Sequence, residues 1–129
     1  MAEDSAHFRQ RLFDTFVKEA QGHMAAMPAL LDKLERDAGA TGTLHDLLRE
    51  IHSLKGAASA VEQDDVAFLC RLLEQRLHQV LRGDKAVDAS FCELFRQGGA
   101  LLDTGLPEVA SGGKFIISLQ FLESMRKLT

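Results

Sequence analysis

The segment that decides the fold is residues 43–61, TLHDLLREIHSLKGAASAV, in which apolar side chains recur every three or four residues. This spacing places them on one face of an α-helix, so the segment is predicted to be helical and to bury that face. Thr43 and Asp46 have a spacing that resembles a capping box, which predicts that the helix begins at Thr43. The predicted core positions are Leu44, Leu47, Leu48, Ile51, Leu54, Ala58 and Val61.

The chain before this segment follows the same helical pattern. A cap at Asp4 or Ser5 is expected to start a first helix that runs to about Asp37. Pro28 lacks the N–H that a helix interior needs, so we expect the helix to be bent or interrupted near it. The predicted core positions are Phe8, Leu12, Phe16, Met24, Met27, Leu30, Leu31 and Leu34.

Two helices are expected directly after the central segment. The turn at residues 62–65 supplies a new cap for a third helix, whose apolar positions run from 66 to 81. A fourth helix is expected to begin at Asp88 or Ser90 and to end before Gly105 and Pro107.

A fifth, peripheral helix is expected at about residues 114–128, after the glycine-containing linker at 111–113. Residues 115–117 alone are also compatible with a strand. The apolar positions at helical spacing are Phe115, Leu119, Leu122 and Met125.

These elements predict an all-α fold, because helices joined by short turns pack as antiparallel neighbours. We expect an antiparallel up-down four-helix bundle with its core at about residues 5–105, and an additional C-terminal helix. All 129 residues are expected to form one domain.

Composition argues against several classes of protein. With 46% hydrophobic residues, 26% charged residues and a formal net charge of −4, the chain lacks the basic surface of a nucleic-acid-binding protein. No apolar run reaches the roughly 18 residues of a membrane span, and the acidic N-terminus is unlike a secretory signal, so we expect a cytoplasmic protein. Cys70 and Cys92 are isolated thiols and are expected to be reduced and buried.

His52 is predicted at the edge of the apolar face of the central helix. At about 100° per residue it falls roughly 40° beyond Leu48. Lys55 at i+3 places a cation beside the imidazole, and Gly56 at i+4 leaves the surface bare enough for another protein's active site to approach. This layout is typical of a phosphorylatable histidine. The predicted partner-binding residues on this flank and its outer side are His45, Arg49, Gly56 and Ser59.

Glu74 is the predicted helper of His52. The turn between the second and third helices centres near Gln63, about equally far from both residues, so they lie at the same height in an antiparallel hairpin. The Glu74 carboxylate would then accept the proton of one imidazole nitrogen and leave the other free to attack. Whether the two flanks converge depends on the hand of the bundle, which the sequence leaves open. The other interpretation of Glu74 is an exposed pair with Arg71.

The stretch from His52 to Gly56, HSLKG, resembles the signature of histidine phosphotransfer domains. The whole chain resembles the N-terminal phosphotransfer domain of chemotaxis kinases of the CheA type, in the order of five helices, the histidine on the second, and the glutamate 22 residues downstream. The resemblance implies that His52 is the phosphoacceptor and that Lys55 and Glu74 are its helpers. The family often places a second glycine ten residues after the histidine, where this chain has Glu62.

The resemblance also implies the partners. The donor would be the ATP-binding catalytic domain of a histidine kinase, the acceptor an aspartate of a CheY-like response regulator, and the domain itself part of a chemotaxis-type sensor kinase. Residues 112–114 lack the spacing of a Walker-type phosphate loop, so we expect no cofactor on this domain and ATP with Mg²⁺ on the donor. The domain alone would be a phosphoryl carrier.

Two alternatives stay open. A metal-binding bundle could use His45, His52 and Glu74, but the two histidines are about 10.5 Å apart along a helix axis, which is too far for one ion. A scaffolding bundle would bind a partner helix through an apolar groove without phosphotransfer.

Overall fold

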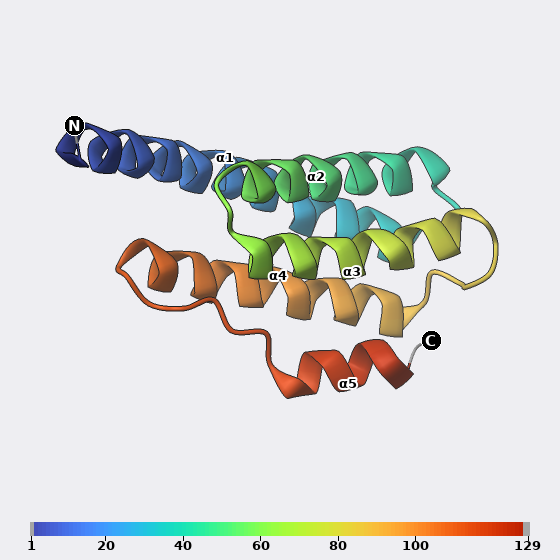
Figure 1. The fold of residues 1–129 in the computed structure, drawn as a ribbon. Coiled ribbons are helices and arrows are strands. Elements are labelled where there is room, and N and C mark those ends of the chain that lie inside the picture. Colours follow the sequence, from blue (N-terminus) through green and yellow to red (C-terminus); the bar gives the residue numbers. More distant parts are fainter. Residues whose placement is uncertain (1, 128–129) are drawn as a thin grey trace.

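A computed structural model of the protein describes residues 2–127, with side chains from residue 4 onward. This range contains five helices and no strand: α1 (Ala2–Arg36), α2 (Thr41–Ala60), α3 (Asp64–Leu81), α4 (Ala89–Ala110) and α5 (Leu119–Lys127). Helices α1 to α4 run up and down as neighbours, and α5 packs on the outside against α4 (Figure 1). The predicted all-α bundle with an additional C-terminal helix is confirmed.

The core is built from the faces that the helical spacing predicts. The buried residues of α2 are Leu44, Leu47, Ile51, Leu54 and Ala58. The buried apolar residues of α3 that meet the same core are Val66, Leu69, Cys70, Leu73 and Leu77. Each fully buried leucine contributes about 1.5–3 kcal/mol through removal of apolar surface from water. Cys70 and Cys92 are buried free thiols, as predicted.

The N-terminal turns of α1 extend beyond the bundle (Figure 1). Helix α1 has 35 residues and α2 has 20, so at about 1.5 Å per residue α1 is much the longer rod. Phe8 and Leu12, in the N-terminal part of α1, are exposed, so their prediction as core residues is wrong.

Pro28 lies inside α1 without interrupting it, so of the two expected outcomes, a bend or an interruption, the interruption does not occur. The proline ring is exposed, whereas Met27 and Leu31 on the neighbouring turn are buried. Packing of these side chains stabilises the helix at the turn where proline removes a backbone hydrogen bond.

Helix α2 begins at Thr41, two residues earlier than the predicted capping box. Ala40 occupies the N-cap position, and no side chain of the described residues caps this end. Asp46 does not reach back to Thr43, because its carboxylate accepts a hydrogen bond from Arg49 at 3.1 Å. The predicted capping box is therefore wrong.

The starts of α3 and α4 differ in their capping. Gln63 is the N-cap of α3 and makes no side-chain cap, whereas Asp64 and Asp65 lie in the first turn, where a negative charge favours the helix dipole. The side-chain cap expected from residues 62–65 does not form, and the negative charges of Asp64 and Asp65 stabilise this end of the helix instead. The Asp88 carboxylate accepts a hydrogen bond from the Phe91 N–H at 2.9 Å, which confirms the predicted cap of α4.

Glu62 closes the turn between α2 and α3 with a φ of 60°. This left-handed backbone costs a residue with a Cβ about 1–2 kcal/mol, and glycine adopts it freely. The turn therefore keeps a geometry that suits glycine although the chain carries glutamate there.

Helix α4 continues through Gly105 and Pro107 to Ala110, so the prediction that it ends before them is wrong. Tertiary packing explains why Gly105 stays helical. A Cβ built at Gly105 would overlap two ring carbons of Phe115, so the missing side chain makes room for that ring. Phe115 is buried there and fixes the segment that returns from α4 toward α5.

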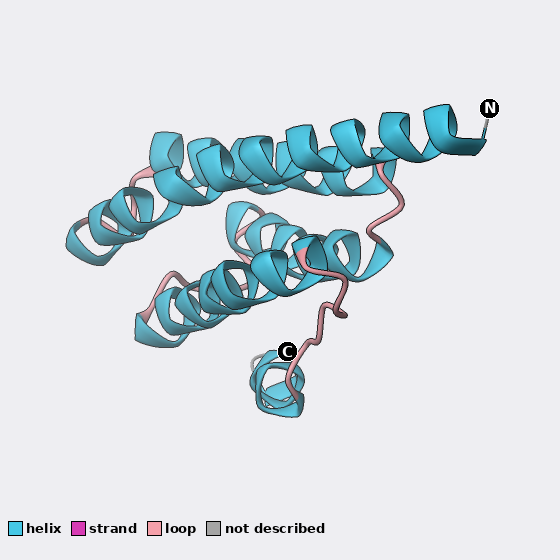
Figure 2. Cartoon of the chain, turned by 90° about the vertical axis from the view of Figure 1, so that its left-hand side faces the viewer, coloured by secondary structure: helices cyan, strands magenta, loops and turns pink. Residues whose placement is uncertain are grey.

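Helix α5 begins at Leu119, later than the predicted residue 114, and residues 114–118 form neither helix nor strand. Leu119 at its first position is 80% exposed, whereas Phe121 and Met125 are buried. Figure 2 shows α5 nearly end-on beside helices that run obliquely, so its axis is inclined to theirs. The end of the predicted helix, 128, lies outside the described residues.

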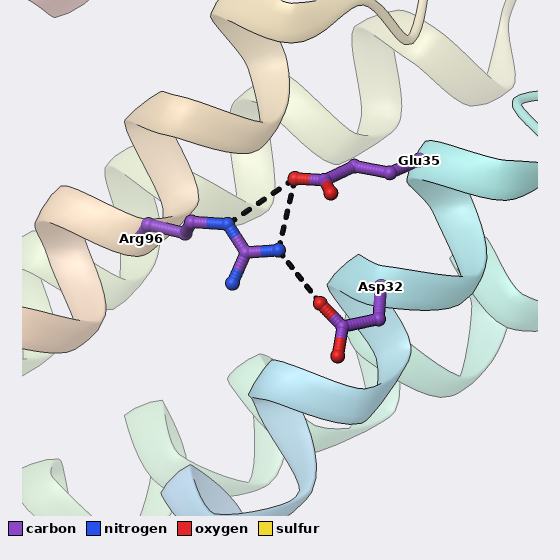
Figure 3. Close-up of polar contacts among 3 residues, drawn as sticks. All are labelled: Asp32, Glu35 and Arg96. Atoms are coloured by element: carbon purple, nitrogen blue, oxygen red, sulfur yellow. Dashed lines mark hydrogen bonds and ion pairs between the residues drawn. The ribbon is translucent and has the colours of Figure 1, made fainter.

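An ion-pair cluster joins α1 to α4 (Figure 3). One guanidinium nitrogen of Arg96 lies 2.9 Å from both Asp32 and Glu35, and its Nε lies 3.2 Å from Glu35. The hydrogen bond to Glu35, together with the one to Asp32, raises the pKa of Arg96, so the cation is retained at any ordinary pH.

Within residues 2–127, no helix is long and apolar enough to cross a membrane.

Replacement of Gly105 with alanine is expected to destabilise the fold by about 1–3 kcal/mol, because the new methyl group overlaps the Phe115 ring. Gly99→Ala is the matched control in the same helix, since a Cβ there meets no described side chain within 4 Å. The control should gain up to about 1 kcal/mol from helix propensity. Urea unfolding followed by circular dichroism measures both, and equal effects of the two variants would contradict the packing role of Gly105.

Candidate functional site

His52 and Glu74 meet on the outer face of the α2–α3 pair. His52 Nδ1 lies 2.7 Å from Glu74 Oε2. The His52 side chain is 69% exposed and that of Glu74 only 12%. The two flanks therefore converge at one height, and the imidazole extends into solvent while the carboxylate lies beneath it.

Lys55 completes the cluster from the next turn of α2. Its Nζ donates a hydrogen bond of 2.7 Å to Glu74 Oε1, so each carboxylate oxygen has its own partner. The exposed pair between Glu74 and Arg71 that the sequence also allowed is replaced by these contacts across the helix pair. Glu74 thus directly contacts both of the other residues with predicted chemical roles.

The charge of Glu74 determines the tautomer of His52. Burial works to raise the pKa of Glu74, but hydrogen bonds from Lys55 and His52, with their charges, bring it below its usual value. An ionised carboxylate can only accept a hydrogen bond, so Nδ1 of His52 carries the proton that is donated. The Nε2 lone pair is then free on the exposed side of the ring.

Cys70 lies one turn before Glu74 on α3 and is fully buried. Burial, and then the charge of Glu74, raise the pKa of the Cys70 thiol to about 12. The thiol therefore stays protonated near neutral pH and does not act as a nucleophile, because that role requires the thiolate.

Gly56 has no packing reason to be glycine within the described part of the chain. A Cβ built there meets nothing within 4 Å, and the residue is exposed one turn after His52. Glycine in a helix interior costs about 1 kcal/mol relative to alanine. The open surface beside His52 is thus present at the expense of helix stability.

The other predicted partner-binding residues lie on the exposed surface of α2. Ser59 lines a groove between α2 and α3, together with Lys55. Arg49 is exposed and pairs with Asp46 at 3.1 Å, and His45 is exposed. The structure gives them accessible positions, and their role in binding a partner stays a prediction.

Two features near the site were not predicted from the sequence. His23 Nδ1 on α1 lies 2.7 Å from the Glu50 carboxylate on α2. Phe68 is an exposed aromatic side chain on α3 in the groove that contains Lys55. A large aromatic residue on the polar face of α3, opposite the apolar stripe, was the one available signal.

Metal coordination is the alternative to test at this site. Over the residues that the structure describes, no group of three histidine, cysteine, aspartate or glutamate side chains is placed to hold a metal ion. The set of His45, His52 and Glu74 considered from the sequence therefore does not assemble.

Comparison with known protein families identifies the family to which the chain belongs. A model of the Hpt domain family matches residues 11–112, which include most of α1 and all of α2, α3 and α4. The chain belongs to the Hpt domain family.

Curated relatives of this Hpt domain are chemotaxis proteins. The chemotaxis protein CheA of Bacillus subtilis (strain 168) is 29% identical over 100 residues, which cover 78% of this chain and 15% of that protein. CheA of Halobacterium salinarum is 25% identical over 100 residues, covering 78% of the chain and 15% of that protein. The Hpt domain thus spans about one sixth or less of the length of these relatives.

A solved structure has the same fold. It is the crystal structure of the phosphorylated P1 domain of CheA3 in complex with CheY6 from R. sphaeroides. The two superpose with a TM-score of 0.78 at 19% sequence identity, covering 92% of this chain and 93% of the other.

Glu74→Gln is expected to lower the free energy of unfolding at pH 7 by about 1–3 kcal/mol, because it removes a charged hydrogen-bond acceptor. The folded-state pKa of Glu74 is lowered, so its contribution is present above the usual value of 4.5 and is lost as the pH falls through the folded pKa. The difference between wild type and variant should therefore shrink in acid.

Urea unfolding between pH 7 and pH 3 measures this difference. Glu19→Gln, at an exposed position on α1, is the matched control and should have little effect at any pH. A penalty for Glu74→Gln that is constant with pH would contradict the stabilising role of the charge.

Gly56→Ala is expected to raise the free energy of unfolding by up to about 1 kcal/mol, because the added methyl group meets no described neighbour and alanine is the better helix former. Thermal melting of the Hpt domain and the variant checks the sign. A lower melting temperature would show that Gly56 has a packing role after all.

Proposed function

We propose that this Hpt domain is a phosphotransfer module of chemotaxis-type signalling, with His52 as the residue that carries the phosphoryl group. The observation that carries the proposal is the 2.7 Å contact of His52 Nδ1 with Glu74 on a ring that is 69% exposed. One nitrogen is fixed and protonated, and the other is free and accessible. A phosphoryl acceptor needs this combination of orientation and access.

The first step is proposed to be attack by His52 Nε2 on the γ-phosphorus of ATP. An N–P bond forms, the bond between phosphorus and the bridging oxygen breaks, and ADP leaves with that oxygen. The ring gains positive charge, which its Nδ1–H shares with the Glu74 carboxylate at 2.7 Å. Phosphoryl transfer depends mainly on positioning and electrostatics, so no further acid or base is required on this chain.

The second step passes the phosphoryl group to an aspartate of a response regulator. The N–P bond breaks, a bond to the carboxylate oxygen forms, and the imidazole returns to its neutral form. Lys55 lies one turn from His52 with its Nζ held by Glu74, which places a cation beside the added phosphoryl oxygens. We assign Lys55 and Glu74 as positioning residues for both steps.

ATP and Mg²⁺ are proposed to bind to the donor, a kinase catalytic domain of the CheA type. The sequence of this domain offers no phosphate-binding loop of the Walker type. The similarity to CheA proteins supports a chemotaxis kinase as the donor.

The acceptor is proposed to be a CheY-like receiver domain. Support comes from the structural neighbour, a phosphorylated P1 domain in complex with CheY6. The surface around Gly56 and Ser59, with Arg49 and His45 on its outer side, is proposed to contact the partner proteins. The cytoplasmic location expected from the sequence stays a prediction.

His52→Gln is expected to abolish phosphate incorporation and to leave the fold unchanged, because the side chain is largely exposed and contributes little to packing. Labelling with radioactive ATP and a CheA-type catalytic domain, followed by tests of acid lability and alkali stability, identifies a phosphohistidine. His78→Gln, at another exposed histidine on α3, is the control and should label normally. An acid-labile label retained on the His52 variant would overturn the assignment.

A further inference from the structure

A groove of about 600 Å³ runs from the phosphorylation site toward the turn between α2 and α3. Lys55 and Arg71 lie at its end next to His52, and Asp64 and Asp65 lie at its other end, in the first turn of α3. Ser59 and Phe68 line the middle. The groove is therefore basic, then apolar, then acidic with increasing distance from His52.

Phe68 and Arg71 form one unit on α3. The Arg71 guanidinium lies over the Phe68 ring, 5.3 Å from its centroid, which is within the range of a cation–π contact. Phe68 is 38% exposed although it is a large aromatic residue. Across the described residues Arg71 has no ion-pair partner, so its charge is available to another molecule. Aromatic and arginine side chains of this kind are the usual anchors of protein interfaces.

We propose that Phe68 and Arg71 are the specificity-determining contacts for the receiver domain that takes the phosphoryl group from His52. The inference rests on the proposed function and names a part of the docking surface that lies on α3, beyond the predicted residues of α2. The occupant presents an apolar side chain to Phe68, with carboxylates on the side toward His52.

Charge complementarity selects the acceptor as the occupant. A receiver reacts through an aspartate, so its face is acidic where it approaches His52, and there it meets Lys55 and Arg71. The opposite charge of Asp64 and Asp65 at the far end disfavours the reversed orientation. The contacts of Arg71 with the receiver's carboxylates and of Phe68 with its apolar side chain thus fix both the orientation and the affinity of the bound receiver.

The test measures each half of the relay separately. The probe is a CheY-type receiver, chosen from a panel because the wild-type domain phosphorylates it. Single-turnover transfer from the labelled domain, at increasing receiver concentration, separates the limiting rate from the half-saturating concentration. Labelling by the kinase domain is measured for the same variants, and circular dichroism confirms that they fold.

Phe68→Ala is expected to raise the half-saturating receiver concentration about tenfold, with the limiting rate and the labelling by the kinase within about twofold of wild type. Arg71→Glu should slow association, and the loss should diminish at high salt. The controls are Leu119→Ala and Lys127→Glu on α5, which remove an exposed apolar side chain and reverse a charge on the helix that packs against α4. Both should transfer as wild type.

An unchanged half-saturating concentration for Phe68→Ala would overturn the inference and leave the proposed function intact. Equal losses in labelling by the kinase and in transfer to the receiver would also overturn it, because the groove would then serve the donor. Failure of the wild-type domain to accept or pass on phosphate with any kinase or receiver would contradict the proposed function itself.

Discussion

The carboxylate of Glu74, held by His52 on one oxygen and by Lys55 on the other at 2.7 Å each, is the interaction on which the site depends. A carboxylate that is mostly shielded from water must be paired, and both of its partners come from α2. The pair of contacts therefore joins α2 to α3 and fixes the tautomer of the imidazole. The negative charge of Glu74 thus serves both the packing of the helix pair and the orientation of His52.

Much of this arrangement follows from the sequence because it depends on local periodicity and counting. The spacing around Ile51 and Leu54 predicts the buried face of α2, and equal distance from the turn predicts that His52 and Glu74 share one height. The hand of the bundle decides whether their flanks converge, and it is set by packing of all the helices together. No single segment contains that information.

The failed predictions at proline and glycine share one physical cause, which is that tertiary packing overrides local signals. Pro28 and Pro107 stay within helices, and Gly105 remains helical because the Phe115 ring packs on its bare backbone. Gly56 has the same local character as Gly105 but meets no neighbour among the described residues. A glycine that admits an intramolecular ring and one that leaves a surface open look identical in the sequence, and only the three-dimensional neighbours distinguish them.

His52 and Glu74 differ in solvent exposure, and this difference affects which positions of such a domain can change over evolutionary time. The groups that orient the imidazole lie below the surface, while the residues around it that a partner would touch are exposed. Substitutions at exposed positions usually change stability by less than about 0.5 kcal/mol. Under the proposed function, substitutions among these exposed residues can change which partner binds while the groups that orient His52 stay in place.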